Sequence, residues 1–417
     1  MSSQHVPTAS RTVRTDTGDR PLRVAFFTDT FVPTHDGVAQ VTDTLARTLT
    51  RLGHAVVVFT VRPPGEPGWT IRPDGVQIRR FLSVAAPSYP QYRIAALPWF
   101  PSPDGRKSFD VIHIHTPGVV GLAGLLAARR WGVPTVGTYH TDLAGMLRGS
   151  GRTALARRFF RAWGQFAVDL CAKCDVATAP TEASRATLAR QARGPMVASP
   201  VLVPNGVDTT VFRPDASRGG EPSDRGGAAA PMISFVGRLT RDKGYQRFLG
   251  ALELLGRRRD WVAVLAGDGP HRHEVERMVG PGTPLADRVR YLGPISEEEK
   301  AHLLARTRVF VLPSLSDTSS VALLEALASG AAAVVTERGG PAEIARSSGA
   351  GIVVDPEDLP AIARAIEALL APPVLSASAP RAGREWVIAN ASSDRMAEAY
   401  VSCYRRAVRA KRGHRPP

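Results

Sequence analysis

The sequence predicts an α/β protein made of two doubly wound domains that face each other across a cleft. Short, continuous apolar runs alternate with longer helical runs along most of the chain, which is typical of parallel strands covered by helices on both faces. The alternation stops once, between residues 212 and 231, where Gly, Ser, Asp, Arg and Pro dominate, and then it restarts. The length of 417 residues also favours more than one domain.

The first domain is expected over residues 22–211, after a polar, disordered leader at 1–21. It opens with the strand Arg23–Phe27, a loop of turn residues and a helix over Val38–Leu52, which Gly53 ends. The same alternation predicts further strands at Ala55–Thr60, Val111–Ile114, Thr135–Thr138, Val176–Ala179 and Val201–Val203, and helices at Val119–Arg130, Thr153–Cys171 and Thr181–Arg193.

The second domain is expected over residues 232–375, after a linker at 212–231. Its predicted elements are strands at Ile233–Val236, Trp261–Ala266, Arg290–Leu292, Val309–Leu312 and Ala332–Val335, and helices at Tyr245–Gly256, Glu297–Ala305, Val321–Leu327 and Leu359–Leu370. Residues 376–417 are expected to hold one long helix, from about Arg384 to Arg409, and a basic tail. Because such sheets bind ligands at the carboxyl ends of their strands, the loops there are the candidate site.

Composition restricts the compartment and the partners. Lys and Arg outnumber Asp and Glu by 53 to 38, a net charge of +15 that favours polyanions. Six of these positive charges stand in the last thirteen residues, where a solvated tail is the simpler interpretation. Three cysteines cannot build a disulfide framework, the leader has no apolar signal core, and the apolar run Pro117–Ala128 is too short to span a bilayer. We therefore expect a cytoplasmic protein, either free or peripheral at the inner membrane face.

The segment Val236–Gly244 is a candidate anion site. It follows the first strand of the second domain and places Arg238 and Lys243 five residues apart, just before a helix. Backbone N–H groups and two long cations there can bind a diphosphate from one side, whereas an exposed basic turn is the alternative. A Gly-Asp-Gly turn follows the next strand, so Gly267 is expected at the same edge of the sheet.

Two carboxylates eight residues apart form a second candidate. Asp317 precedes a predicted helix that Ser319 or Ser320 can cap. Glu325 lies about one turn inside this helix, within reach of sugar or ribose hydroxyls. A capped surface helix with an incidental Glu is the alternative.

The first domain offers two further candidates. Gly37 follows Asp36 at the start of a helix, and a glycine there permits close approach of a phosphate or a sugar. His140 comes directly after a predicted strand and so lies at the ligand-binding edge. His113 and His115 alternate within one strand, share a face, and are interpreted as core residues.

Neither a metal nor a cofactor is expected. The sequence has no Asp-x-Asp pair that would suit a metal-bound sugar diphosphate, and no G-x-x-x-x-G-K-[ST] loop. Cys171 and Cys174 form a C-x-x-C that closes a helix, with no second pair, so they are interpreted as structural cysteines.

Taken together, these segments resemble glycosyltransferase family 4, the retaining nucleotide-sugar transferases of the GT-B fold. The order and spacing of the segments match the family over about residues 22–370. The opening FTDTFVPTHDGV and the YHTD segment look most like bacterial mannosyltransferases that use GDP-mannose, and like related sulfoquinovosyl and glucosyl transferases. The matching segments are FFTDTFVPTHDGVAQ, FDVIHIHTPG, TVGTYHTD, VPNGVDTTVFRP, SFVGRLTRDKG, LAGDGP, YLGPI, VFVLPSLSDTSSVALLEALASG and ERGGPAEI.

The resemblance implies roles for single residues. Arg238 and Lys243 match the pair that binds the donor diphosphate, and Glu325 matches the closing Glu of E-x7-E, which contacts the donor ribose. Gly37 matches the loop glycine near the diphosphate, and His140 matches a position near the 6-hydroxyl of the sugar. The chain departs from the family where Asp317 replaces the first Glu and Ser319-Ser320 replaces Phe-Gly. This departure allows an unusual donor sugar.

The resemblance implies metal-independent transfer of a hexose, with retention, from a nucleotide-diphosphate sugar such as GDP-mannose or a UDP-sugar. The acceptor would be a hydroxyl group on a lipid, a glycan or a small natural product. Another nucleotide-sugar enzyme on the same fold, an epimerase or a phosphorylase, is the first alternative. A non-enzymatic polyanion binder is the second, although no nucleic-acid partner is expected because no aromatic and basic recognition motif is present.

One segment of the first domain suggests contact with a membrane. Basic and aromatic residues gather at the start of one predicted helix and could contact anionic lipid head groups. The alternative is a helix with one core face and one solvated Arg face. The residues are Arg148, Arg152, Arg157, Arg158 and Arg161, with Phe159, Phe160 and Trp163.

Overall fold

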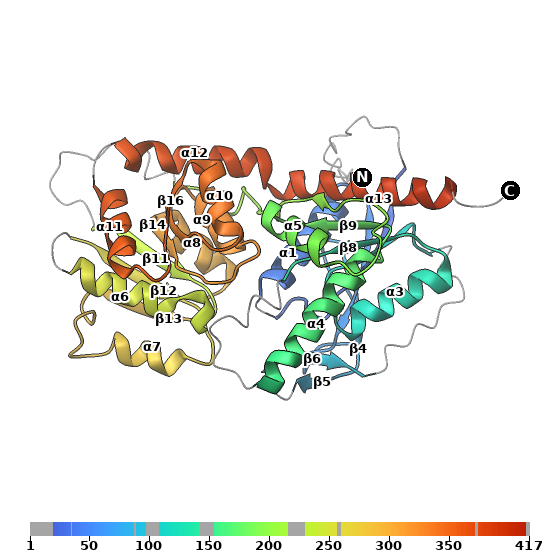
Figure 1. The fold of residues 1–417 in the computed structure, drawn as a ribbon, viewed down its shortest axis with the longest axis horizontal. Coiled ribbons are helices and arrows are strands. Elements are labelled where there is room, and N and C mark those ends of the chain that lie inside the picture. The colour runs from blue at the N-terminus through green and yellow to red at the C-terminus, as the bar shows by residue number, and fades with distance from the viewer. Residues whose placement is uncertain are drawn as a thin grey trace, which may run out of the picture.

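The computed structural model describes residues 20–34, 36–86, 89–96, 108–141, 154–215, 230–256, 260–371 and 374–413. Figure 1 shows two α/β halves side by side, with the last two helices running along both of them. The predicted α/β class is confirmed by two sheets whose main strands are parallel. Most of the predicted leader and linker falls outside the described residues.

The N-terminal half contains an eight-stranded sheet in the order β10-β9-β8-β7-β1-β2-β4-β3 and a separate hairpin, β5–β6. All neighbours in the large sheet are parallel except β3 and β4. The strands are β1 (Arg23–Phe27), β2 (Ala55–Val61), β3 (Trp69–Ile71), β4 (Gln77–Phe81), β5 (Ser83–Ala86), β6 (Tyr89–Ala95), β7 (Val111–Ile114), β8 (Thr135–Thr138), β9 (Val176–Ala179) and β10 (Val201–Leu202). The helices of this half are α1 (Gly37–Arg51), α3 (Val119–Trp131), α4 (Ala154–Ala172) and α5 (Glu182–Gln191).

Strand β1 shows why the sheet is covered on both faces. Its side chains alternate, and each set enters a different core. Val24 and Phe26 pack with residues of α1, whereas Ala25 and Phe27 pack with residues of α3. A strand buried on both sides has no polar face, which is why it reads as one continuous apolar run in the sequence.

The C-terminal half contains a six-stranded parallel sheet in the order β13-β12-β11-β14-β15-β16. Its strands are β11 (Met232–Val236), β12 (Val262–Ala266), β13 (Val289–Gly293), β14 (Thr307–Leu312), β15 (Ala332–Thr336) and β16 (Gly351–Val354). The helices are α6 (Tyr245–Leu255), α7 (Arg272–Met278), α8 (Glu297–Arg306), α9 (Val321–Ala328), α10 (Gly340–Ser348) and α11 (Leu359–Leu370), with the short helix η3 (Arg241–Lys243). The apolar side chains of α6 and α11 cover one face, and those of α8, α9 and α10 cover the other.

The end of the chain differs from the single helix expected over Arg384–Arg409. The structure has two helices, α12 (Val374–Asn390) and α13 (Ser393–Gly413). The break occurs because the backbone of Val207 donates to the carbonyl of Ala391 at 2.9 Å and accepts from the amide of Ser393 at 2.8 Å. Helix α12 packs on the C-terminal half, whereas α13 crosses to the N-terminal half, as Figure 1 shows. There Tyr400 and Tyr404 are fully buried in the core beside β1.

Two sequence interpretations of buried polar residues are confirmed. His113 and His115 lie in β7 and are buried in the N-terminal half. Cys171, Cys174 and Cys403 are buried free thiols, so none of them forms a disulfide. No helix among the described residues is long and apolar enough to cross a membrane.

Candidate functional site

The site lies where the carboxyl ends of the strands of the two halves meet. In the C-terminal half, the loop after β11 carries Arg238 and Lys243, and the loop after β14 carries Asp317. In the N-terminal half, the loop after β1 leads to Gly37, and His140 follows β8. This is the edge at which the sequence predicted a ligand.

Gly267 packs the two turns of the C-terminal edge against each other. Its φ of +138° is open to glycine, and a Cβ there would collide with the carbonyl oxygen of Gly237. The backbone N–H of Leu239 also donates to the carbonyl of Asp268 at 2.9 Å. The structure thus shows Gly267 holding in position the turn that carries Arg238, while direct contact of Gly267 with a donor stays a prediction.

Lys243 and Asp317 form an ion pair between the loops after β11 and β14. The backbone supports this pair, because the amide of Leu315 donates to the carbonyl of Asp242 at 2.7 Å. Gly244 has a φ of +79°, and a Cβ there would collide with the carbonyl oxygen of Pro313. Among the described residues, the second carboxylate oxygen of Asp317, Oδ2, is buried without a hydrogen-bond partner. It is free to accept a hydrogen bond from a ligand hydroxyl.

Arg238 reaches across to the N-terminal half. Its Nη1 donates to the hydroxyl of Tyr92 in β6 at 3.2 Å. Burial opposes the charge of Arg238, but Tyr92, Asp242, Asp36 and Asp317 together raise its pKa above the usual value. The guanidinium is therefore a permanent cation that faces acidic groups from both halves.

Asp36 and Gly37 begin helix α1 on the opposite wall. Asp36 is the N-cap: its Oδ1 accepts from the amide of Ala39 at 2.9 Å, and Thr30 donates to Oδ2. Burial raises the pKa of the Asp36 carboxyl, against the effect of these hydrogen bonds and of Arg238. A Cβ on Gly37 would lie 3.9 Å from the side chain of Val321, so the first residues of α1 and α9 face each other.

The two predicted capping residues of α9 differ in position. Ser320 is the N-cap, and its hydroxyl accepts from the amide of Leu323 at 3.2 Å, as the sequence predicted. Ser319 lines a groove behind α9, together with Trp386 of α12 and Asn205. Contact of Ser319 and Ser320 with a donor stays a prediction.

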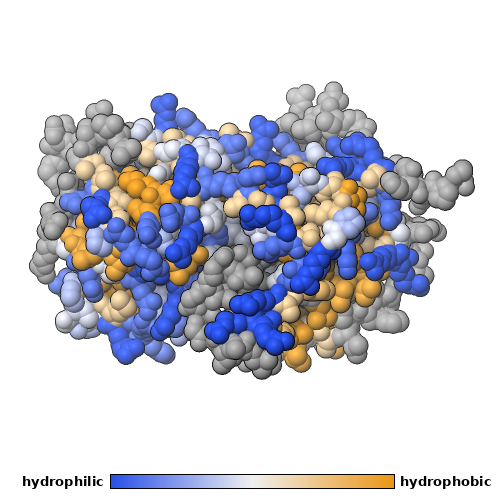
Figure 2. All heavy atoms as spheres, viewed as in Figure 1, coloured by the Kyte–Doolittle hydropathy of each residue, from blue (hydrophilic) through white to orange (hydrophobic). Residues whose placement is uncertain are grey.

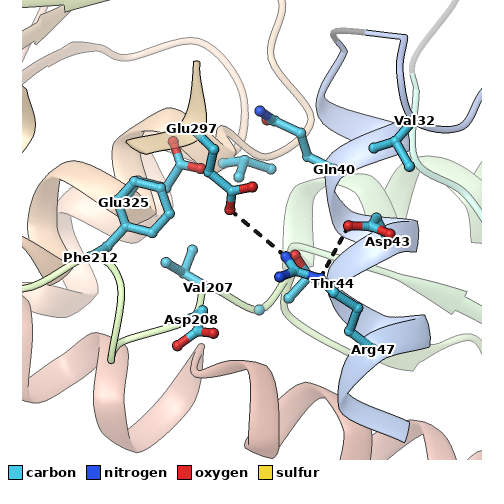
Figure 3. Close-up of a pocket in the computed structure, with 12 residues that line it drawn as sticks. Val32, Gln40, Asp43, Thr44, Arg47, Val207, Asp208, Phe212, Glu297 and Glu325 are labelled. Carbon is cyan, nitrogen blue, oxygen red and sulfur yellow. Dashed lines mark ion pairs between the residues drawn. The ribbon is translucent and has the colours of Figure 1, made fainter. Parts of the chain in front are cut away.

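Glu325 lies one turn inside α9 and forms a buried ion pair with Lys300 of α8. Their Oε1 and Nζ atoms are 2.6 Å apart. Burial raises the pKa of the Glu325 carboxyl, and Lys300 lowers it. Glu325 also lines a small cavity between the two halves, of about 30 Å³, which is room for about two water molecules. Figure 3 shows Glu297, Glu325 and Phe212 on one side of this cavity and Gln40, Asp43 and Arg47 of α1 on the other.

His140 is a buried, neutral imidazole. Its Nε2 lies 3.2 Å from Nδ1 of His115, and burial lowers the pKa of His140 to about 4. Thr318 donates a hydrogen bond to the backbone carbonyl of His140, which connects this residue to the loop that carries Asp317. At neutral pH the ring can exchange hydrogen bonds with hydroxyl groups but carries no charge.

Further contacts hold the two halves together beside the site. The hydroxyl of Thr181 donates to the carbonyl of Thr318 at 2.8 Å. The carboxylate of Glu343 in α10 accepts from the amides of Glu182 and Ala183, at 2.9 and 3.2 Å, and so caps helix α5 of the other half.

Sequence reasoning missed three residues of this site: Tyr92, Lys300 and Thr318. Tyr92 belongs to a hairpin that the sequence analysis did not predict. Nothing in the sequence around Lys300 distinguishes it from the many other basic residues. The predicted residues do converge in two groups, Arg238 with Lys243 and Asp317, and Gly37 with the start of α9. Two cations opposite the start of a helix can hold a diphosphate, and the free carboxylate oxygens can accept hydrogen bonds from hydroxyl groups. Among the described residues, no group of three His, Cys, Asp or Glu side chains could hold a metal ion.

Family models match most of the chain. One described as glycosyltransferase family 4 matches residues 35–211, and one described as glycosyl transferases group 1 matches residues 230–372. A protein named GDP-mannose-dependent alpha-mannosyltransferase, from Mycolicibacterium smegmatis, is 31% identical over 346 residues, which cover 80% of this chain and 84% of that protein.

Solved structures share the fold. Sucrose-phosphate synthase from Thermosynechococcus elongatus superposes with a TM-score of 0.73 at 22% identity, covering 93% of this chain and 99% of that one. HepE from Anabaena, solved in complex with UDP-glucose, superposes with a TM-score of 0.68 at 16% identity, covering 92% and 99%. The predicted GT-B architecture is confirmed by these superpositions.

Proposed function

Since the chain belongs to glycosyltransferase family 4 and is a hexosyltransferase, we propose that it transfers mannose from GDP-mannose to an acceptor hydroxyl with retention of the anomeric configuration. The relative from Mycolicibacterium smegmatis supports GDP-mannose as the donor. A UDP-sugar is the second candidate donor, because HepE, which shares the fold, was solved with UDP-glucose.

One observation carries this proposal: Arg238, Lys243 and Asp317 converge at the facing strand ends of the two halves. Lys243 is paired with a carboxylate, and Arg238 faces several acidic groups. A diphosphate can replace these internal partners, since it offers the same charge with more acceptor oxygens. We therefore assign the binding of the donor diphosphate to Arg238 and Lys243.

The reaction breaks the bond between the anomeric carbon of the sugar and the diphosphate oxygen. Negative charge then develops on that oxygen, and Arg238 and Lys243 stabilise it without needing to reorganise. The acceptor hydroxyl oxygen forms its bond to the anomeric carbon from the same face. Its proton passes to the leaving phosphate oxygen, so atoms and charge balance without a further base.

The sugar would lie between Asp317 and His140. Oδ2 of Asp317 is buried and free among the described residues, which suits a sugar hydroxyl. His140 is neutral and close to the Asp317 loop through Thr318, which suits a second hydroxyl. Because Asp is one methylene shorter than the Glu of related sequences, we expect the hexose preference of this site to differ from that of enzymes with Glu at this position.

Binding and product analysis test the proposal. Calorimetry on the full-length protein should show GDP and GDP-mannose binding more tightly than UDP and UDP-glucose. Incubation with GDP-mannose and a panel of simple alcohols, read by ¹H NMR, should give the α-mannoside. A β-product would overturn retention. An epimerised donor in the absence of any acceptor would contradict the transfer reaction. Tighter binding of UDP than of GDP would indicate a UDP-sugar as the donor instead of GDP-mannose.

We also propose that helix α4 contacts an anionic membrane, where a lipid-linked acceptor would be presented. Phe159, Trp163 and Phe166 follow helical spacing and are exposed, Phe159 by 56%. The charged residues Arg158 and Arg161 lie on the same helix. Apolar residues also gather on the surface between α3 and α4, at the lower right of Figure 2. On α3, Leu126 is 56% exposed. Arg148 and Arg152, which the sequence also indicated, lie outside the described residues.

Liposome flotation tests the membrane proposal. The full-length protein should float with vesicles that contain phosphatidylglycerol at low salt, and less with vesicles of phosphatidylcholine alone. Trp163→Ser should reduce flotation, while Lys173→Ser, an exposed change at the end of the same helix, should not. Absence of flotation at low salt with anionic vesicles would exclude membrane contact by this surface.

A further inference from the structure

The ion pair between Lys300 and Glu325 is the most deeply buried lysine–carboxylate pair among the described residues. Its side chains are only 7% and 4% exposed, and Oε1 of Glu325 lies 2.6 Å from Nζ of Lys300. Both residues belong to the C-terminal half, on α8 and α9, which pack against each other. The pair therefore does not depend on how the two halves close.

Lys300 is surrounded by the ring of Phe212 and by the carboxylate of Glu325, its paired anion. Its ammonium nitrogen lies 5.2 Å from the centre of the Phe212 ring, an arrangement in which the ring face stabilises a cation. A lysine buried in this way needs a paired anion, because desolvation of a free ammonium is costly.

Glu325 uses only one of its carboxylate oxygens in this pair. Among the described residues, Oε2 is buried and has no hydrogen-bond partner. Glu325 also lines the cavity between the halves, opposite Gln40 and Thr44 of α1 and beside Val321. One oxygen is thus held by Lys300, and the other remains for a ligand.

The charges around Glu325 explain why the cation is required. Glu297 lies on α8 and raises the pKa of Glu325, as does burial, whereas Lys300 lowers it. Across the cavity, Arg47 of α1 is engaged by Asp43 at 3.1 Å and by Glu297 at 3.8 Å, as the dashed lines of Figure 3 show. Asp208 lines the same cavity and adds a further negative charge. Lys300 is therefore the cation that favours the ionised form of this carboxyl.

We propose that Lys300 is a positioning residue that holds one oxygen of Glu325 and so turns the free oxygen toward the ribose hydroxyls of the donor nucleotide. The inference rests on the proposed function, since it takes the donor to be a nucleoside diphosphate sugar. A carboxylate with one free oxygen accepts a hydrogen bond from a ribose hydroxyl strongly, whereas a protonated carboxyl does so weakly. The structure thereby assigns selection for ribonucleotides to a pair of residues rather than to Glu325 alone.

Calorimetry with matched nucleotides tests this role on the full-length protein. The probes are GDP and 2′-deoxy-GDP, with UDP and 2′-deoxy-UDP as the second pair. The wild type should bind the ribonucleotide about tenfold or more tightly than its deoxy form, as expected for a hydrogen bond to a charged group. Lys300→Met should reduce this ratio to less than about threefold at pH 7, while Lys300→Arg should retain it.

The pH profile separates positioning from a merely structural role. Without the ammonium, burial and Glu297 keep the pKa of Glu325 high, so its carboxyl is protonated at lower pH and ionises as the pH rises. In Lys300→Met the preference for the ribonucleotide should therefore return as the pH rises above 7. Glu325→Gln should lack the preference at every pH, and Lys173→Met, the same change at an exposed lysine, should behave like the wild type.

The outcomes distinguish the inference from the function on which it rests. A full preference in Lys300→Met, or its loss in a folded Lys300→Arg, would overturn the positioning role. If Lys300→Met does not fold, Glu325→Gln decides, because an undiminished preference there contradicts the ribose contact. A wild type that binds GDP and 2′-deoxy-GDP equally overturns the inference alone, whereas a wild type that binds neither GDP nor UDP overturns the proposed function.

Discussion

The two walls between the halves of the molecule carry their polar groups differently. On the C-terminal wall, Lys243 pairs with Asp317 and Lys300 pairs with Glu325. On the N-terminal wall, buried His115 and His140 contact each other, and burial lowers the pKa of both. The ion pairs of the C-terminal wall are therefore suited to binding an anionic ligand, whereas the uncharged histidines of the N-terminal wall are suited to hydrogen bonds with hydroxyl groups.

The two pairs of the C-terminal wall also differ from each other. Lys243 and Asp317 are 20% and 9% exposed, whereas Lys300 and Glu325 are 7% and 4% exposed. Water and ligands can therefore compete for the first pair, and the second pair stays together. The predictions below test this contrast, from the largest expected effect to the smallest.

Breaking the buried pair should cost the most folding stability. Lys300→Met removes the cation from a buried carboxyl, which must then either stay charged without a partner or take up a proton, and we expect a loss of about 3–5 kcal/mol in the free energy of unfolding, measured with urea. The double change Lys300→Met with Glu325→Leu should recover most of the loss, since apolar replacement of a whole buried pair is often neutral. A single variant that loses less than about 1 kcal/mol would contradict the contrast between the two pairs.

Removing a cation of the proposed diphosphate site should affect the reaction rather than the fold. Lys243→Ala and Arg238→Ala should each lower kcat/KM for GDP-mannose by about tenfold to a thousandfold, equivalent to about 2–4 kcal/mol of transition-state stabilisation. Lys173→Ala serves as the control, because that lysine is exposed just after the end of α4. Two variants that turn over the donor like the wild type would refute the assignment of the diphosphate site.

The buried histidines of the N-terminal wall predict a dependence of stability on pH. The pKa of His140 is about 4 in the folded protein because of burial, against about 6.5 in the unfolded chain. Below pH 6.5 the unfolded chain binds protons that the folded ring does not, so stability should fall as the pH drops toward 4. Between pH 6.5 and 5.5 we expect a loss of about 1 kcal/mol from this residue. His140→Gln should flatten the slope in urea titrations, and an unchanged slope would show that His140 is protonated in the fold.

Freeing Lys243, the less deeply buried of the two paired lysines, should have the smallest effect. Asp317→Asn removes the internal partner of Lys243, so free GDP should bind about fivefold more tightly, equivalent to about 1 kcal/mol. Transfer of mannose should not improve with it, because Oδ2 of Asp317 is assigned to a sugar hydroxyl. Calorimetry with GDP and the rate with GDP-mannose measure the two effects, and weaker binding of GDP would contradict competition between Asp317 and the diphosphate.

The core strands and the cation loops could be predicted because their signals are local. Arg23–Phe27 is buried on both faces and therefore reads as one apolar run, and Ser320 caps α9 as its position before an apolar helix indicated. The hairpin β5–β6 was missed, since Leu82, Val84 and Ile94 are exposed there and follow no core pattern. Tyr92, the partner of Arg238, was missed with it.

Pairings between distant segments could not be predicted from one sequence. Lys300 and Glu325 are on different helices, and nothing in the spacing of the chain indicates that they meet. The break between α12 and α13 was missed for the same reason, because it depends on backbone bonds from Val207. The only local signal for a stop is the group of residues typical of helix ends at Asn390, Ser392 and Ser393, which the helical periodicity on both sides outweighed.

The chain passes between its two halves at two places, and these places are bonded to each other. Val207 on the outgoing strand pairs with Ala391 and Ser393 on the returning one. The two crossings are thus joined at one point, so a movement of one half relative to the other would bend the backbone there. Because Tyr400 and Tyr404 anchor the returning helix in the opposite core, this junction cannot be released by local fraying at the end of the chain.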